Sequence, residues 1–171
     1  MSNFTTFLGV KMSQASYIIP FWEKILFEND FRRIVEFGTY KGGLSLFFLL
    51  WCMQRKSAFY TYDNMAHKYS RLGYGLKLPQ HFKKIDIFKH EKEIGEIIQR
   101  PGRTIVFCDN GDKPRELKIF SKYLKPGDII GVHDFNTEVM ENDIPSDLTI
   151  IGIETGEPKG EPKTLILRKD E

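Results

Sequence analysis

The sequence alternates short apolar runs with longer segments whose apolar residues recur at helical spacing, and this alternation constrains the fold strongly. Short apolar runs bounded by turn residues are typical of buried strands. We expect five such strands, at Arg33–Phe37, Ala58–Tyr62, Phe82–Ile87, Thr104–Asp109 and Asp128–His133. We expect helices over about 13–28, Gly43–Met53, Glu91–Gln99 and Arg115–Leu124. This order of elements predicts a parallel sheet with covering helices and right-handed crossovers.

The end of the chain follows a different pattern. Leu148–Glu154 and Thr164–Arg168 are β-like runs, and the Gly/Pro-rich link between them contains no helix. A parallel crossover needs roughly a dozen or more residues, so this link predicts an antiparallel hairpin. The 171 residues fit one domain of ordinary size, and we expect a single α/β domain over residues 1–171.

Charge and hydropathy exclude several classes of partner. The chain has 25 basic and 23 acidic residues, a balance that does not favour nucleic acid or an anionic membrane. The longest apolar run, Leu46–Met53, is too short to span a bilayer, and the N-terminus lacks a signal-peptide pattern. Cys52 and Cys108 lie in apolar runs and are interpreted as reduced core thiols. These features predict a cytoplasmic protein without nucleic-acid or membrane partners.

The glycine-rich segment EFGTYKGGLS, Glu36–Ser45, follows the first strand and opens the next helix. In open α/β sheets, ligands bind at the carboxyl ends of the strands where the strand order switches. A dinucleotide-binding turn would carry glycine at position 40, so that a pyrophosphate can approach the backbone. This chain has Tyr40 there, and the Glu36 carboxylate repels phosphate and suits a cationic ligand. The segment therefore disfavours a nicotinamide-dependent oxidoreductase, while a purely structural turn remains an alternative.

Two further aspartates close the second and third expected strands. Asp63 stands 27 residues after Glu36, where an acidic side chain can accept hydrogen bonds from ribose hydroxyls. The alternative for Asp63 is a turn or helix-capping residue. Asp86 is a weaker candidate for the surroundings of an adenine, and by itself it resembles a solvated turn carboxylate.

Asp109 and the pair His133–Asp134 end two apolar strands. The carboxyl ends of neighbouring parallel strands lie at one edge of a sheet, so we expect these side chains to meet beside Gly38. Two carboxylates and an imidazole can hold a hard divalent cation. Alternatively, one of them serves as general base for an acceptor hydroxyl, or each simply ends its strand in a turn.

These motifs resemble class I S-adenosylmethionine (SAM)-dependent methyltransferases. EFGTYKGGLS resembles their first motif, in the form found in the cephalosporin hydroxylase-like and small-molecule O-methyltransferase branches. Ile105–Lys113 and Leu124–Phe135 resemble the motifs of their fourth and fifth strands. The resemblance covers about Phe21 to Phe135. It implies a Rossmann-like three-layer sandwich with a mostly parallel seven-stranded sheet of order 3-2-1-4-5-7-6, ending in the antiparallel hairpin.

The resemblance also implies a cofactor and its binding residues. SAM would be bound by the first strand, the glycine-rich turn and the next two strand ends, at Glu36, Gly38, Tyr40, Gly42, Asp63 and Asp86. In metal-dependent members, residues matching Asp109, His133 and Asp134 bind Mg²⁺, and an imidazole at 133 would favour Mn²⁺. His133 departs from the acidic residue of the family pattern.

The implied activity is transfer of the SAM methyl group to an oxygen of a small molecule, such as a saccharide or secondary metabolite. His133 or Asp109 would take the acceptor proton, or a divalent metal would lower its pKa. The family's acceptor-covering N-terminal segments are nearly absent, so either the acceptor pocket cannot be read from this sequence or a second subunit of a homo-oligomer completes it. The alternative is a non-catalytic SAM- or nucleotide-binding or interaction module on a degenerate methyltransferase fold.

Overall fold

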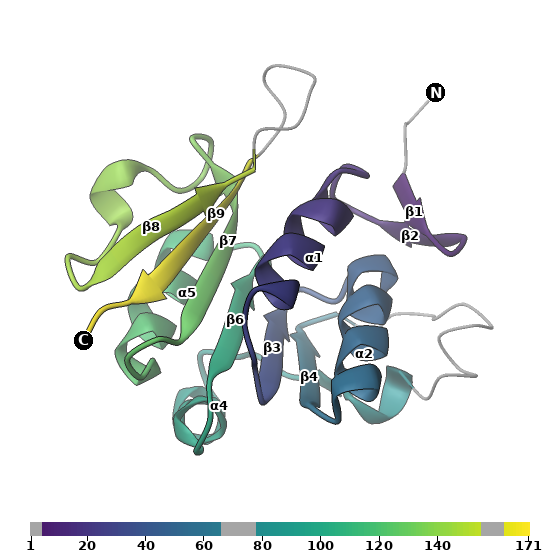
Figure 1. Ribbon diagram of the computed structural model, residues 1–171, viewed down its shortest axis with the longest axis horizontal. Helices are drawn as coiled ribbons and strands as arrows, with labels where there is room; N and C mark the ends of the chain where they lie inside the picture. Colours follow the sequence, from purple (N-terminus) through teal and green to yellow (C-terminus); the bar gives the residue numbers. More distant parts are fainter. Residues whose placement is uncertain (1–4, 66–77, 155–162) are drawn as a thin grey trace.

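The computed structural model describes residues 5–65, 78–154 and 163–171 (Figure 1). Seven strands form the main sheet: β3 (Arg33–Phe37), β4 (Ala58–Asp63), β5 (Phe82–Lys84), β6 (Thr104–Cys108), β7 (Ile129–Phe135), β8 (Leu148–Ile153) and β9 (Lys163–Lys169). Their order in the sheet is β5-β4-β3-β6-β7-β9-β8. Numbered from β3 as the first strand, this is the predicted order 3-2-1-4-5-7-6.

The pairing directions also agree with the prediction. The strands from β5 to β7 pair in parallel, whereas β9 pairs antiparallel with both β7 and β8. The predicted terminal hairpin is therefore confirmed, and its turn at 155–162 lies outside the described residues. Figure 1 shows β8 and β9 extending the sheet beyond β7.

Helices cover both faces of the sheet, so side chains that alternate along each strand enter two separate cores. On one face are α1 (Ile18–Phe27) and α2 (Gly43–Arg55), and Ile105 and Phe107 of β6 point into this core. On the other face are α4 (Glu91–Gln99) and α5 (Lys113–Phe120), which pack against Val106 and Cys108 of the same strand. Every residue of β3 and β6 is buried, as expected for the centre of a covered parallel sheet.

Short elements connect these layers. They are the single-turn helices η1 (Leu78–Gln80), η2 (Ser121–Tyr123) and η3 (Glu141–Asp143). The helix expected over Arg115–Leu124 consists of α5 followed by η2, and it begins earlier because the Asp112 side chain caps it. No helix within the described segments is long and apolar enough to cross a membrane.

Two expected elements are several residues shorter than predicted. The first helix begins at Ile18 rather than near residue 13, because Pro20 is tolerated in the first turn of a helix but not further inside. The third strand ends at Lys84 rather than Ile87. The Asp86 side chain accepts a hydrogen bond from the backbone N–H of Phe88, which turns the chain away from the sheet.

The sequence analysis also missed an N-terminal hairpin, formed by β1 (Thr5–Phe7) and β2 (Val10–Met12). These strands have only three residues each, too few for a recognisable alternation. The hairpin packs on the first turn of α2, where a Cβ at Gly43 would lie 2.7 Å from the carbonyl oxygen of Lys11. Gly43 therefore permits the hairpin to dock.

Trp22 connects α1 to α2 and to the sheet. Its fully buried ring makes edge-to-face contacts with Phe48 and Phe107, with ring centroids 5.3 and 5.5 Å apart. The same ring lies over Gly131 of β7, where an added Cβ would come within 2.8 Å of it. The aromatic cluster thus fixes α1 across the strands that carry the carboxyl-end residues.

We predict that Trp22→Ala lowers the free energy of unfolding by about 3–5 kcal/mol, because it leaves a cavity among three elements. Phe27→Ala, in the same helix, is the matched control: Phe27 is 81% exposed, so its removal should change stability by less than about 0.5 kcal/mol. Urea denaturation of both variants measures the two values. Similar losses in the two variants would contradict this account of the core.

Candidate functional site

The candidate site lies where the strand order of the sheet reverses, between β3 and β6. Gly38 follows β3 and donates its backbone N–H to the carbonyl of Tyr62 on β4, at 2.8 Å. Asp109 follows β6 and donates its N–H to the carbonyl of Phe37 on β3, at 3.0 Å. The carboxyl ends of these strands therefore meet at one edge, the position at which open α/β sheets bind ligands.

A cavity of about 370 Å³ opens at this edge, within the range of about 300–1,000 Å³ that is typical of ligand pockets. Six of the predicted site residues line it: Gly38, Tyr40, Asp63, Asp109, His133 and Asp134. Glu36, Gly42 and Asp86 are not among its described lining residues. The structure therefore brings together the middle of the glycine turn, Asp63 and the cluster at 109, 133 and 134.

The turn after β3 has no room for a side chain at Gly38. Its φ is +94°, and a Cβ there would lie 2.1 Å from the carbonyl oxygen of Asp109. Tyr40, with φ of 48°, also has a left-handed conformation, and Gly42, with φ of 84°, caps the start of α2. The glycine at 38 is therefore required by contact with β6 as well as by the turn.

Asp63 holds this turn in place. Its Oδ2 accepts a hydrogen bond from the backbone N–H of Tyr40 at 3.1 Å, and its Oδ1 accepts one from Met65 at 2.9 Å. Asp63 is 6% exposed and faces the cavity. A carboxylate at this strand end, facing the cavity, is the type of group that accepts hydrogen bonds from a ribose diol.

Glu36 lies beneath the turn instead of in the cavity wall. It is 1% exposed, and one of its carboxylate oxygens accepts hydrogen bonds from the hydroxyls of Ser45 and Thr61. Burial raises the pKa of Glu36 to about 7, although these two hydrogen bonds oppose the increase. Its contacts join β3, β4 and the first turn of α2, and thereby support the turn.

Asp86 also lies apart from the cavity lining. Besides capping the turn at Phe88, its carboxylate lies 3.6 Å from the Lys89 ammonium, and its side chain is 44% exposed. These are the contacts of a solvated turn carboxylate.

The predicted cluster at the ends of β6 and β7 is present. One potential ligand atom from each of Asp109, His133 and Asp134 lies within 4.8 Å of the others. Asp134 has φ of 62°, a conformation that costs energy for a non-glycine residue and is found disproportionately at functional sites. His133 is buried, with Nδ1 3.2 Å from the Thr164 hydroxyl and Nε2 3.7 Å from Asp134 Oδ1. Burial lowers the pKa of His133 and favours its neutral form.

The sequence analysis gave no role to Lys113, although this residue lies at the centre of the cluster. Its ammonium is 2.6 Å from Asp134 Oδ2, 3.1 Å from Glu138 Oε2 and 3.6 Å from Asp109 Oδ1. Burial alone would lower the pKa of Lys113, but the hydrogen bond to Asp134 and the charges of Asp109 and Asp134 raise it. No residue pattern predicts this contact, because Asp109 lies in the loop before α5 and not on the helix itself.

Gln14 is a second contributor that the sequence did not reveal. It is 5% exposed, precedes α1, and donates a hydrogen bond from its side-chain amide to Asp109 Oδ2. Burial raises the pKa of Asp109 well above its usual range, and the nearby Lys113 ammonium opposes the increase. A segment remote in sequence thus completes the surroundings of Asp109, and no residue pattern near Gln14 predicts that contact.

A divalent metal does not fit this arrangement. Asp109 already presents Oδ1 to Lys113 and Oδ2 to Gln14, while Asp134 presents Oδ2 to Lys113 and Oδ1 to His133. Mg²⁺ requires oxygen ligands at about 2.0–2.1 Å in octahedral geometry, which these oxygens can supply only if the ammonium leaves. A divalent ion and a buried ammonium would also repel each other.

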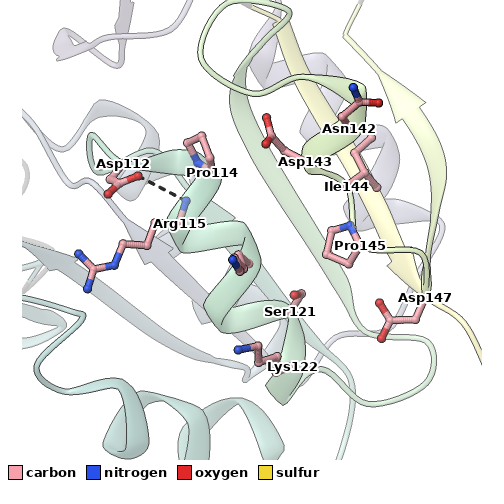
Figure 2. Close-up of a pocket in the computed structure, with 11 residues that line it drawn as sticks. Asp112, Pro114, Arg115, Ser121, Lys122, Asn142, Asp143, Ile144, Pro145 and Asp147 are labelled. Atoms are coloured by element: carbon pink, nitrogen blue, oxygen red, sulfur yellow. Dashed lines mark hydrogen bonds between the residues drawn. The ribbon is translucent and has the colours of Figure 1, made fainter.

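A larger cavity, of about 730 Å³, lies between α5 and the segment 142–147 (Figure 2). Its walls carry both charges, with Lys118 on α5 and Lys122 on η2, and with Asp143 and Asp147 opposite. Figure 2 shows the Arg115 side chain pointing away from the opposite wall, and its guanidinium stacks on Phe88 at 3.9 Å. None of the predicted site residues lines this cavity, so we do not assign it to the candidate site.

We predict that Gly38→Ala destabilises the protein more than Gly111→Ala does. Both glycines have φ near +100°, so either substitution should cost about 1–2 kcal/mol for the left-handed conformation. At position 38 the new Cβ also collides with backbone, which adds about 1–3 kcal/mol. At position 111 nothing lies within 4 Å of the new Cβ, so this second cost is missing. Chemical denaturation compares the two variants, and equal losses would contradict the required close approach.

We predict that Glu36→Gln changes how stability depends on pH. The folded wild type holds the Glu36 proton more tightly than the unfolded chain, so its free energy of unfolding falls as pH rises from about 4.5 to about 7. The free energy of unfolding of the glutamine variant does not fall in this way. Relative to the wild type it should therefore increase by on the order of 3 kcal/mol across that interval. Denaturation at pH 4.5 and pH 8 measures the change. Parallel pH profiles for the two proteins would show that Glu36 is not a buried acid of raised pKa.

No family model and no curated protein matches the sequence. The fold does match solved structures. The O-methyltransferase from Bacillus cereus, described in complex with SAH, has a TM-score of 0.62 at 12% identity, covering 93% of this chain and 83% of its own. TomG, an O-methyltransferase from Streptomyces achromogenes described in complex with SAM, has a TM-score of 0.55 at 16% identity, covering 91% and 79%.

A third structure, cofactor-bound Rv0187 from MTB, has a TM-score of 0.65 at 14% identity and covers 94% of this chain and 83% of its own. Identities this low establish the shared fold and not a shared activity. The chain therefore has the Rossmann-like fold of these O-methyltransferase structures, as its strand order and glycine-rich turn predict.

Proposed function

We propose that this protein is a SAM-dependent methyltransferase that acts on an oxygen atom of a small molecule. The observation that carries the proposal is the cavity at the strand switch, which combines the Gly38 turn with three lining carboxylates, Asp63, Asp109 and Asp134. Lys113 is the one ammonium among the described lining residues, so the cavity has an excess of negative charge. Such a cavity attracts a cationic ligand without phosphate groups, which describes SAM.

The donor-binding roles follow from the contacts around the turn. In the proposal, the backbone from Gly38 to Gly42 surrounds the methionine end of SAM, and Asp63 accepts hydrogen bonds from its ribose hydroxyls. Glu36 supports the turn from below and does not itself contact the ligand. Two structures of the same fold support this assignment, because they are described as O-methyltransferases in complex with SAM or SAH.

Bound SAM supplies an electrophilic methyl group for in-line displacement, so the protein mainly has to align the acceptor oxygen and remove its proton. His133 is the better proton acceptor in this proposal, because it lines the cavity and burial keeps it neutral. Asp134 Oδ1, at 3.7 Å from its Nε2, would stabilise the imidazolium once it forms. Asp109 is less suitable, because Gln14 and Lys113 already occupy its oxygens.

We also propose that the protein is cytoplasmic and has no nucleic-acid partners. Both cysteines, Cys52 and Cys108, are buried and free, as in a reducing compartment. The acidic lining of the cavity repels phosphate backbones.

Calorimetric titration with SAM tests the site. We predict that the wild type binds SAM and that Asp63→Ala lowers the affinity roughly tenfold or more, since each of two lost hydrogen bonds contributes about 0.5–1.5 kcal/mol. Asp86→Ala is the matched control: it removes a strand-end carboxylate outside the described cavity lining, so the affinity should be unchanged.

Three results would count against the proposal. They are absence of SAM binding by the wild type, unchanged affinity in a folded Asp63→Ala variant, and tighter binding of NAD⁺ than of SAM. Circular dichroism of each variant establishes that it is folded before titration. Loss of affinity in Asp86→Ala would instead restore that residue to the adenine site.

A further inference from the structure

The Lys113 ammonium is surrounded by carboxylates in the position where the sequence motif predicts a metal ion. It lies 2.6 Å from Asp134 Oδ2 and 3.6 Å from Asp109 Oδ1, the two aspartates of the predicted ligand set. Glu138 Oε2, at 3.1 Å, is its third partner. Asp134 and Glu138 lie within hydrogen-bond distance of the ammonium, and Asp109 forms a longer ion pair with it.

The fold fixes this ammonium from the helix side. Lys113 is the first residue of α5, whose start is set by the Asp112 cap and by Pro114 in the first turn. The Lys113 side chain is only 6% exposed, so its stem is held by packing. Because Asp109 immediately follows β6 and Lys113 begins the next helix, the short link between them keeps the two charges together.

We propose that Lys113 is a built-in cation that replaces the divalent metal at this site. Its ammonium neutralises Asp109 and Asp134 and holds their carboxylates in place, and the protein works without a bound metal ion. Removing the ammonium then exposes a latent divalent-cation site formed by Asp109, His133 and Asp134. The inference concerns the same cavity as the proposed function and uses its assignment of the acceptor side.

The physical reason is that buried carboxylates need a compensating charge. Asp109 and Asp134 have side chains only 10% and 15% exposed, so loss of the ammonium would leave two poorly solvated negative charges close together. A small hard cation satisfies them directly, and an imidazole in the ligand set favours Mn²⁺. A protein with the ammonium in place gains nothing from the metal, because the two cations compete for the same oxygens.

The test compares Mn²⁺ binding by the wild type and by Lys113→Met, measured by calorimetry and by the electron paramagnetic resonance signal of free Mn²⁺. Methionine keeps the apolar stem and removes the charge. We expect Lys113→Met to bind one Mn²⁺ at least a hundredfold more tightly than the wild type. Lys118→Met is the matched control, because it removes an exposed lysine from the same helix and should leave Mn²⁺ binding unchanged.

A second substitution identifies the ligands: Lys113→Met combined with Asp134→Asn should lose the acquired Mn²⁺ binding. Tight Mn²⁺ binding by the wild type that Asp134→Asn abolishes would overturn the proposal. So would a folded Lys113→Met protein that binds Mn²⁺ no better than the wild type. If Lys113→Met does not fold, Lys113→Gln replaces it, and the wild-type titration still decides whether a metal occupies the site.

The outcome is separable from that of the proposed function. Mn²⁺ binding is measured without SAM or an acceptor, so a protein that fails to bind SAM can still give the expected metal result. Conversely, a wild type that binds SAM and also requires Mn²⁺ would keep the methyltransferase assignment and reject the role of Lys113.

Discussion

The close approach of Gly38 to the Asp109 carbonyl is the constraint on which the site depends. At this point the strand order reverses, and the ends of β3 and β6 come so near that a methyl group would collide with backbone. The contact sets the floor of the cavity, because the lining residues other than Ser13 lie at or shortly after the ends of β3, β6 and the neighbouring strands. A packed sheet interior positions the strand ends, so the site derives its rigidity from the core.

The charges of the cavity are organised around that floor. Asp63 holds the turn through the backbone N–H of Tyr40 and also accepts the N–H of Met65, whereas Asp109 and Asp134 are held by Lys113. These acids therefore differ in what they can offer to a ligand. Asp63 is fixed in position by backbone groups and faces the cavity, while the oxygens of Asp109 and Asp134 have side-chain partners within the protein.

The sequence predicts the sheet almost completely and the site only in part. Apolar runs and link lengths determine strand order, because burial on two faces and chain connectivity leave few alternatives. The positions of Asp63, Asp109 and His133 follow in turn, since each lies within two residues of a strand end. Glu36 shows the limit: the motif identifies it, but only the structure shows that it lies under the turn with Ser45 and Thr61. Gln14 and Lys113 act through contacts that local pattern does not encode, and the two three-residue N-terminal strands are too short to leave a signal.

The contact between Gln14 and Asp109 joins residues 95 positions apart and makes the N-terminal segment part of the cavity wall. Ser13 lines the cavity as well, and the preceding hairpin rests on Gly43 at the start of α2. The site is consequently built from two parts of the chain. One is the set of strand ends of the main sheet, and the other is the segment before α1, which contributes Ser13 and Gln14. During synthesis Gln14 is made well before Asp109. The contact between them can therefore form only after β6 has been made, whereas the hairpin and its contact at Gly43 involve neighbouring segments.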